Sequence, residues 1–190
     1  MTRAKQRLAP RERILAAARE LFYRDGIRAV GVEAVAAAAG TNKMTLYRHF
    51  ASKDALVAAY LRQLAAEEDS DWQKIRAEAS GDAQAQLLAL LRRGSSRGCA
   101  FANAAVELAE RRHPAMRIIE EHKSQVRKRL AGLCRAAGYG RPEQLADEIF
   151  LLVEGAQVSL QSAGPGGPGT RLFELLRKLL DAAPRKKRAA

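Results

Sequence analysis

The sequence has few of the residues that mark disulfide-rich, zinc-binding or membrane-spanning proteins. Only two of its 190 residues are cysteines, and Cys99 and Cys134 lie far apart without the CxxC spacing of a zinc site. Its longest apolar runs, such as residues 149–153, are far shorter than the ~20 residues that cross a bilayer. Near the N-terminus, the run at residues 14–18 is too short for a signal peptide. We therefore expect a cytoplasmic protein without disulfides, metal sites, membrane contacts or a cofactor.

Alternating apolar and polar runs are also almost absent, which argues against a sheet-based fold. Ala, Leu, Arg and Glu at helical spacing instead predict an all-α protein of about nine helices. The predicted helices cover residues 10–25, 32–39, 42–49, 53–78, 83–94, 101–112, 115–137, 142–163 and 171–183. A Gly- and Pro-rich linker at residues 164–169 separates the last two helices.

Positive charge is concentrated at the two ends of the chain, whose formal net charge is +12. Residues 1–60 hold 11 Lys or Arg against 5 Asp or Glu, and residues 184–190 hold 4 against none. The segment between them is close to neutral. A basic N-terminal third favours a polyanionic partner, with nucleic acid ahead of an anionic membrane. Residues 184–190 are predicted to be a disordered basic tail.

The second and third predicted helices are short and joined by one glycine-containing turn, the pattern of a helix-turn-helix. The small side chain of Ala36 lets the two helices cross closely, and Gly40 permits the positive φ of the turn. Three apolar residues can fill the shared core, namely Val35, Leu46 and Phe50. An ordinary helical corner has the same bare pattern, so the motif needs further support.

That support comes from residues suited to contact DNA. Because Thr41 or Asn42 caps the third helix, the first turn of this helix would face base edges. The residues presented there are Asn42, Lys43, Met44 and Thr45. Lys53 lies in the first turn of the next helix, where a cation opposes the helix dipole unless an anion such as a DNA phosphate binds. Tyr47 and His49 could donate to further phosphates.

Residues 26–56, GIRAVGVEAVAAAAGTNKMTLYRHFASKDAL, closely resemble the N-terminal DNA-binding domain of the TetR/AcrR family of bacterial transcriptional regulators. The resemblance is carried by Ala36, Ala39-Gly40, Thr45-Leu46-Tyr47, Phe50, Ser52-Lys53 and Leu56. It implies that residues 42–45 face the major groove and that Tyr47, His49 and Lys53 hold phosphates. Two residues depart from the family pattern: Gly31 replaces a Ser/Thr cap, and Met44, which can contact a thymine methyl, replaces Gly or Pro.

The resemblance also implies an organisation for the whole chain. Residues 1–52 would form a three-helix DNA-binding domain with a basic N-terminal arm, and residues 53–183 a larger helical domain for ligand binding and dimerisation. The implied function is that of a repressor. A homodimer would bind a palindromic operator in double-stranded DNA, and a small-molecule effector would release it.

The eighth predicted helix is apolar over more than one face. Its main stripe runs through Ile149 and Ala156, while Leu151 and Val158 lie well off that stripe. Leucines give the ninth helix a matching stripe. The eighth and ninth helices are therefore expected to form the homodimer interface, which the family resemblance also favours. The alternative is a wholly internal core.

Helices four to seven would enclose the effector cavity, and four residues are candidate ligand contacts: Trp72, Phe101, Asn103 and His122. His122 lies on the apolar stripe of the seventh helix, where a hydrogen-bonded core histidine is the ordinary alternative. Trp72 and Phe101 could equally be core residues, and Asn103 could face solvent. Cys99 is a possible redox sensor, but no nearby cation or second cysteine is evident in the sequence, which favours an inert thiol.

The competing hypothesis is an all-α small-molecule-binding protein or enzyme with a basic arm. Against it, the three histidines lie near no recognisable nucleophile or phosphate loop, and we expect no catalytic residues. A regulator that activates transcription, or that needs no ligand, has the same sequence features as a ligand-released repressor.

Overall fold

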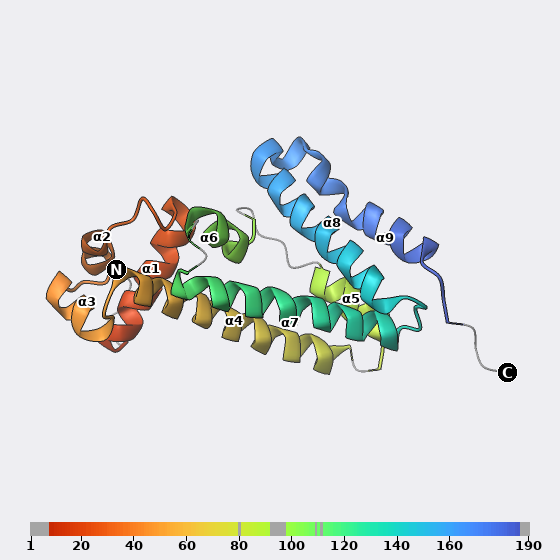
Figure 1. Ribbon diagram of the computed structural model, residues 1–190, viewed down its shortest axis with the longest axis horizontal. Helices are drawn as coiled ribbons and strands as arrows, with labels where there is room; N and C mark the ends of the chain where they lie inside the picture. The colour runs from red at the N-terminus through yellow and green to blue at the C-terminus, as the bar shows by residue number, and fades with distance from the viewer. Residues whose placement is uncertain (1–7, 80, 92–97, 109, 111, 187–190) are drawn as a thin grey trace. The chain divides into compact units, whose positions relative to one another are not determined.

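The computed structural model describes residues 8–79, 81–91, 98–108, 110 and 112–186. Within these ranges the chain forms nine α-helices, two short 3-10 helices and no strand (Figure 1), which confirms the all-α prediction. Residues 1–7 of the predicted basic arm and residues 187–190 of the predicted tail lie outside the described ranges. Among the described helices, none is long and apolar enough to cross a membrane.

Most helix boundaries lie within one residue of the prediction. The helices are α1 (Pro10–Asp25), α2 (Val32–Ala38), α3 (Lys43–His49), α4 (Lys53–Glu78), α5 (Ala83–Leu91), α6 (Ala100–Leu108), α7 (Pro114–Ala136), α8 (Pro142–Ala163) and α9 (Leu172–Ala182). The predicted end of α6 was wrong, because residues 110 and 112 are not helical. The His113 side chain instead begins α7, where its Nδ1 accepts the backbone N–H of Ala115 (3.1 Å). The predicted extension of α5 to residue 94 lies outside the described residues.

The chain forms two compact units. The N-terminal unit comprises Met1–Glu67 and Ala100–Glu120, and the C-terminal unit comprises Glu68–Cys99 and Glu121–Ala190. Consequently α4 and α7 each contribute residues to both units, and α6 belongs to the same unit as α1, α2 and α3. The predicted domain boundary between residues 52 and 53 stays a prediction.

The core of the N-terminal unit is formed by buried residues of α1, α2, α3, α6 and the first parts of α4 and α7. Residues with no more than 1% exposure form its centre: Ile14, Ala18, Val35, Leu46, Leu56, Val57, Leu61, Phe101, Ala104 and Ala115. Phe22 of α1 packs edge-on against Tyr60 of α4, with ring centroids 5.7 Å apart. The backbone N–H of Arg28 donates to the Glu107 carboxylate (2.9 Å), which attaches α6 to the loop between α1 and α2.

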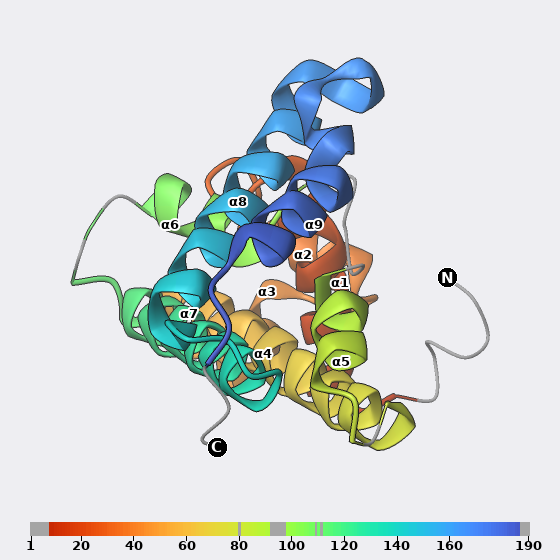
Figure 2. The same ribbon diagram turned by 90° about the vertical axis from the view of Figure 1, so that its right-hand side faces the viewer.

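The C-terminal unit has its own core, formed by α5, α7, α8 and α9. Its buried residues are Leu87, Leu130, Leu133, Cys134, Tyr139, Leu145, Ala146, Ile149, Leu176 and Leu180. α8 and α9 run side by side in both views (Figures 1 and 2). The side chains of Ile149, Leu176 and Leu180 are at most 3% exposed, so the inner faces of α8 and α9 contribute to this core.

The glycine-rich segment between α8 and α9 is folded rather than extended. It forms the 3-10 helices η2 (Gly164–Gly166) and η3 (Pro168–Arg171), and η3 packs on α8. Gly169 is buried so closely that an added Cβ would lie 2.5 Å from the backbone oxygen of Ala156 and 2.8 Å from Cγ of Leu160. The predicted linker is therefore a packed turn, and its glycines let the chain approach the α8 backbone.

We predict that Gly169→Ala lowers the free energy of unfolding by about 1–3 kcal/mol, because the new methyl group would overlap the α8 backbone. Gly166→Ala is the matched control, since nothing lies within 4 Å of a Cβ built at Gly166. Thermal melts of both variants check this. Equal melting temperatures for Gly169→Ala and the wild type would show that the turn is not packed as described.

Candidate nucleic-acid interface

The turn between α2 and α3 has the geometry of a helix-turn-helix. Gly40 has a φ of 64°, in the left-handed region that favours glycine. The Asn42 side chain caps α3, because its Oδ1 accepts the backbone N–H of Thr45 (2.9 Å). Of the two predicted caps, Asn42 is therefore the one that makes this bond. Val35 and Leu46 are completely buried between the helices, which fixes the orientation of α3.

The outward face of α3 carries most of the residues predicted to contact DNA. Met44 is 70% exposed and Tyr47 is 40% exposed, although both are large side chains with apolar surface. Lys43 and His49 are exposed, and Thr45 is half-buried. The face is therefore available to a partner.

The start of α4 provides a second predicted contact. Ser52 caps this helix as expected, since its Oγ accepts the backbone N–H of Ala55 (3.0 Å). Lys53 is the first residue of α4 and is half-buried. Thr41, in the turn, is also half-buried. The N-terminal unit thus brings together the predicted residues Thr41–Thr45, Tyr47, His49 and Lys53.

An ion pair on this face was missed by the sequence analysis. Nζ of Lys43 lies 2.6 Å from Oε1 of Glu33, which belongs to the first turn of α2. The hydrogen bond and the opposite charges lower the pKa of Glu33 and raise the pKa of Lys43. Nζ of Lys43 also lies 6.0 Å from the centre of the Tyr47 ring. A contact between positions ten residues apart on two helices leaves no periodic signal in the sequence.

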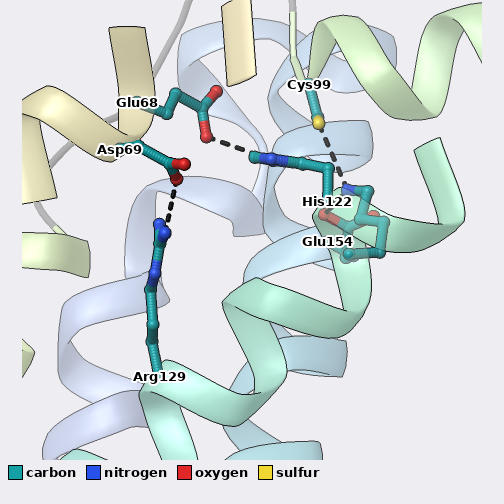
Figure 3. Close-up of polar contacts among 7 residues, drawn as sticks. Glu68, Asp69, Cys99, His122, Arg129 and Glu154 are labelled. Carbon is teal, nitrogen blue, oxygen red and sulfur yellow. Dashed lines mark hydrogen bonds and ion pairs between the residues drawn. The ribbon is translucent and has the colours of Figure 1, made fainter. Parts of the chain in front are cut away.

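The four predicted ligand contacts fall into two groups. Phe101, which is completely buried, and the half-buried Asn103 belong to the N-terminal unit. Trp72 and His122 belong to the C-terminal unit. His122 is 5% exposed, and its Nε2 lies 3.2 Å from Oε2 of Glu68 (Figure 3). These four residues therefore do not converge within a single unit.

Polar contacts join α4 to α7 near His122. Arg129 pairs with Asp69, one residue after Glu68 (Figure 3). The Arg129 guanidinium also lies 5.8 Å from the centre of the Trp72 ring. The structure thus gives both Trp72 and His122 polar or charged neighbours, but it leaves their role as ligand contacts a prediction.

The structure places a cation beside Cys99, although none was evident near it in the sequence. Nζ of Lys123 lies 3.2 Å from Sγ of Cys99 and 2.6 Å from Oε1 of Glu154, and Figure 3 labels the latter two residues. Burial lowers the pKa of Lys123, but Cys99 and Glu154 together outweigh burial and raise it. Cys134 is completely buried, and burial raises the pKa of its thiol to about 11.

A cavity of about 220 Å³ lies in the C-terminal unit between the start of α8 and the end of α9. Its walls include Tyr139, Leu145 and Leu179, with Arg141 and Glu148 also lining it. The predicted effector cavity among helices four to seven is a different location and stays a prediction. The described residues contain no group of three or more His, Cys, Asp or Glu side chains placed to hold a metal ion.

The capped, glycine-turned helix pair with an exposed basic face defines a helix-turn-helix DNA-binding protein. The family model described as bacterial regulatory proteins, tetR family, matches residues 14–60. The Escherichia coli K12 regulator UidR is 42% identical over 53 residues, which cover 28% of this chain and 27% of UidR. The match to this curated relative is thus limited to about a quarter of its length.

Similarity to solved structures extends over nearly the whole chain. The TetR-family regulator SCO4454 of Streptomyces coelicolor is 30% identical, with 90% of this chain and 92% of SCO4454 covered and a TM-score of 0.78. A putative TetR regulator of Streptomyces avermitilis is also 30% identical, with 94% and 100% covered and a TM-score of 0.78. The reduced form of Escherichia coli NemR, 19% identical, shares the fold over 93% of this chain and 98% of NemR, with a TM-score of 0.80.

The chain belongs to the TetR family and is a DNA-binding transcriptional regulator. The family and the similar structures are regulators rather than enzymes, so the enzyme part of the competing hypothesis, an all-α small-molecule-binding protein or enzyme with a basic arm, is wrong. Regulators of this family bind DNA and small-molecule effectors, usually as dimers.

The two thiols should differ sharply in reactivity. At pH 8 we expect a disulfide reagent to modify Cys99 in the native protein and to leave Cys134 intact. Cys134 is completely buried, and a pKa of about 11 leaves roughly one thiolate in a thousand at that pH. When each variant reacts with the disulfide reagent, Cys99→Ser should therefore lack the fast reaction, whereas Cys134→Ser should retain it. The reverse pattern would contradict the burial described for Cys134.

Proposed function

We propose that this regulator is a repressor that binds a palindromic operator as a homodimer and is released by a small-molecule effector. The exposed outer face of α3 carries this proposal, because it combines the basic side chain of Lys43 with the exposed side chains of Met44 and Tyr47. One recognition helix contacts few bases, so two copies related by symmetry supply the specificity. A repressor of this kind acts in the cytoplasm, where its operator is.

The residues on this face would have two different roles. We assign base contacts to Asn42, Lys43, Met44 and Thr45, which occupy the first turn of α3 or cap it. Tyr47, His49 and Lys53 would hold phosphates, and Thr41 would lie beside them in the turn. Met44 offers apolar contact to a thymine methyl group.

Exposed apolar residues support dimerisation through α8 and α9. Leu151 and Val158 of α8 are 69% and 58% exposed, and Phe173 and Leu175 of α9 are 43% and 39% exposed. Gly155, between the first two, has nothing within 4 Å of a built Cβ, so another helix can approach closely there. A second copy of the same pair of helices would bury these side chains in a two-fold interface.

The effector would bind in the C-terminal unit. We propose Trp72 and His122 as its contacts. Trp72 lies close to Arg129 of α7 and His122 lies close to Glu68 of α4, and a polar ligand could bind these charged side chains in place of their present partners. The predicted contacts Phe101 and Asn103 lie in the N-terminal unit and are weaker candidates.

Selection of binding sites from a library of random duplexes tests the function directly. We expect the wild-type protein to enrich an inverted repeat whose half-sites lie about one helical turn apart, or a multiple of it. A half-site without its inverted copy would contradict the homodimer. No enriched sequence at all would contradict an operator-specific repressor.

Lys53→Ala should weaken binding by the same factor on the selected site and on random DNA, because a phosphate contact carries no sequence information. The slope of log affinity against log salt should decrease in magnitude by about 2, because each of the two protomers loses one phosphate contact. Lys74→Ala is the matched control: Lys74 is an exposed lysine of the C-terminal unit that pairs with Asp71. If Lys53→Ala changes the sequence preference but not the salt slope, Lys53 does not hold a phosphate.

Leu151→Glu should convert the dimer to a monomer, since it places a charge in the proposed interface. Val106→Glu is the control, because Val106 is an exposed apolar residue (81%) of α6, which belongs to the N-terminal unit and not to the proposed interface helices. Sedimentation equilibrium measures both variants. Dimers of equal stability would rule out this face of α8 as the interface.

A further inference from the structure

Glu33 and Lys43 form one charged unit on the helix-turn-helix, here called the Glu33–Lys43 pair. Glu33 lies in the first turn of α2 and Lys43 is the first residue of α3, yet Nζ of Lys43 lies only 2.6 Å from Oε1 of Glu33. The two side chains are 64% and 53% exposed, respectively. The pair is therefore accessible to a partner that approaches the start of α3.

The pair holds a flexible lysine in one place. Nζ of Lys43 is bound by Glu33 on one side and lies 6.0 Å from the centre of the Tyr47 ring on the other. Lysine side chains lose considerable rotamer freedom when they are fixed at an interface. Because Glu33 and Tyr47 already restrict Lys43 in the free protein, less freedom remains to be lost when DNA binds.

The position of Glu33 requires an explanation. Glu33 belongs to the same motif as the proposed phosphate contacts Tyr47 and Lys53, where a carboxylate is repelled by the DNA backbone. A carboxylate contributes to DNA recognition by accepting a hydrogen bond from the amino group N4 of cytosine. A lysine ammonium donates to O6 or N7 of guanine. In the major groove these acceptor and donor atoms lie next to each other on one G·C base pair.

We propose that the Glu33–Lys43 pair recognises one G·C base pair in each operator half-site. Lys43 donates to guanine, and Glu33 accepts from the amino group of the paired cytosine while it continues to hold Lys43. The inference rests on the proposed function, since it requires α3 to lie in the major groove. It adds α2 to base recognition and makes Glu33 a specificity-determining residue.

A different role for Glu33 makes opposite predictions. If Lys43 contacted only a phosphate, Glu33 would act as a competing anion that weakens binding to any sequence. Removing Glu33 would then strengthen binding to all duplexes without changing the preferred sequence. The two roles differ in whether Glu33 changes sequence preference, so they can be separated in one experiment.

The experiment is site selection from a random duplex library with the wild type, Glu33→Gln, Lys43→Gln and the double variant. We expect the wild type to select one G·C pair per half-site that depends on Glu33. Glu33→Gln and Lys43→Gln should each lower discrimination at that same position by about 5- to 100-fold. The double variant should lose no more than the larger of the two single losses, because the two residues act as a unit.

Glu120→Gln is the matched control for charge, since Glu120 is an exposed glutamate on α7 of the N-terminal unit. Thermal melts should show that all variants fold, because both residues of the pair are exposed. An unchanged motif with tighter binding of Glu33→Gln to random DNA would overturn the proposal. Losses at two different base positions, or losses that add in the double variant, would also overturn it.

The same selection tests the proposed repressor function and the role of the Glu33–Lys43 pair separately. A wild-type protein that enriches no inverted repeat overturns the proposed repressor function. A wild-type protein that enriches an inverted repeat in which no position depends on Glu33 overturns only the role of the Glu33–Lys43 pair.

Discussion

The close packing of α2 against α3 is the constraint on which the DNA-binding surface depends. Val35 and Leu46 are completely buried between these helices, and the turn that joins them requires the φ of 64° found at Gly40. A residue with a Cβ would be strained there by about 1–2 kcal/mol. With these contacts fixed, the capped first turn of α3 faces outward, and the Glu33–Lys43 pair can form between two short helices.

The same N-terminal unit contains the first part of α4 and the first part of α7, which continue into the C-terminal unit. Glu107 of α6 accepts the backbone N–H of Arg28, and Nε2 of His113 lies 3.3 Å from Oδ1 of Asp54, near the start of α4. α4 and α7 each contribute to both units.

Local features of the fold could be predicted from the sequence, whereas contacts between distant residues could not. Gly40, Asn42 and Ser52 act through their own backbone neighbourhood, so residue type and position were enough to predict the turn and the Ser52 cap, and to limit the α3 cap to Thr41 or Asn42. Glu33 with Lys43, Glu68 with His122 and Cys99 with Lys123 meet only because helices pack, and no periodicity predicts such partners. The segment 164–169 was expected to be a linker because it is rich in Gly and Pro, but the absence of a side chain at Gly169 permits close packing on α8.

Hydroxyl-radical footprinting on a selected duplex tests the central claim most directly, because it shows how many copies of α3 contact the DNA and with what symmetry. The account predicts two protected segments of equal strength, related by a two-fold axis and centred about one helical turn apart or a multiple of it. A single protected segment, or two segments arranged head to tail, would contradict the claim that a symmetric dimer presents its two recognition helices to one palindromic site.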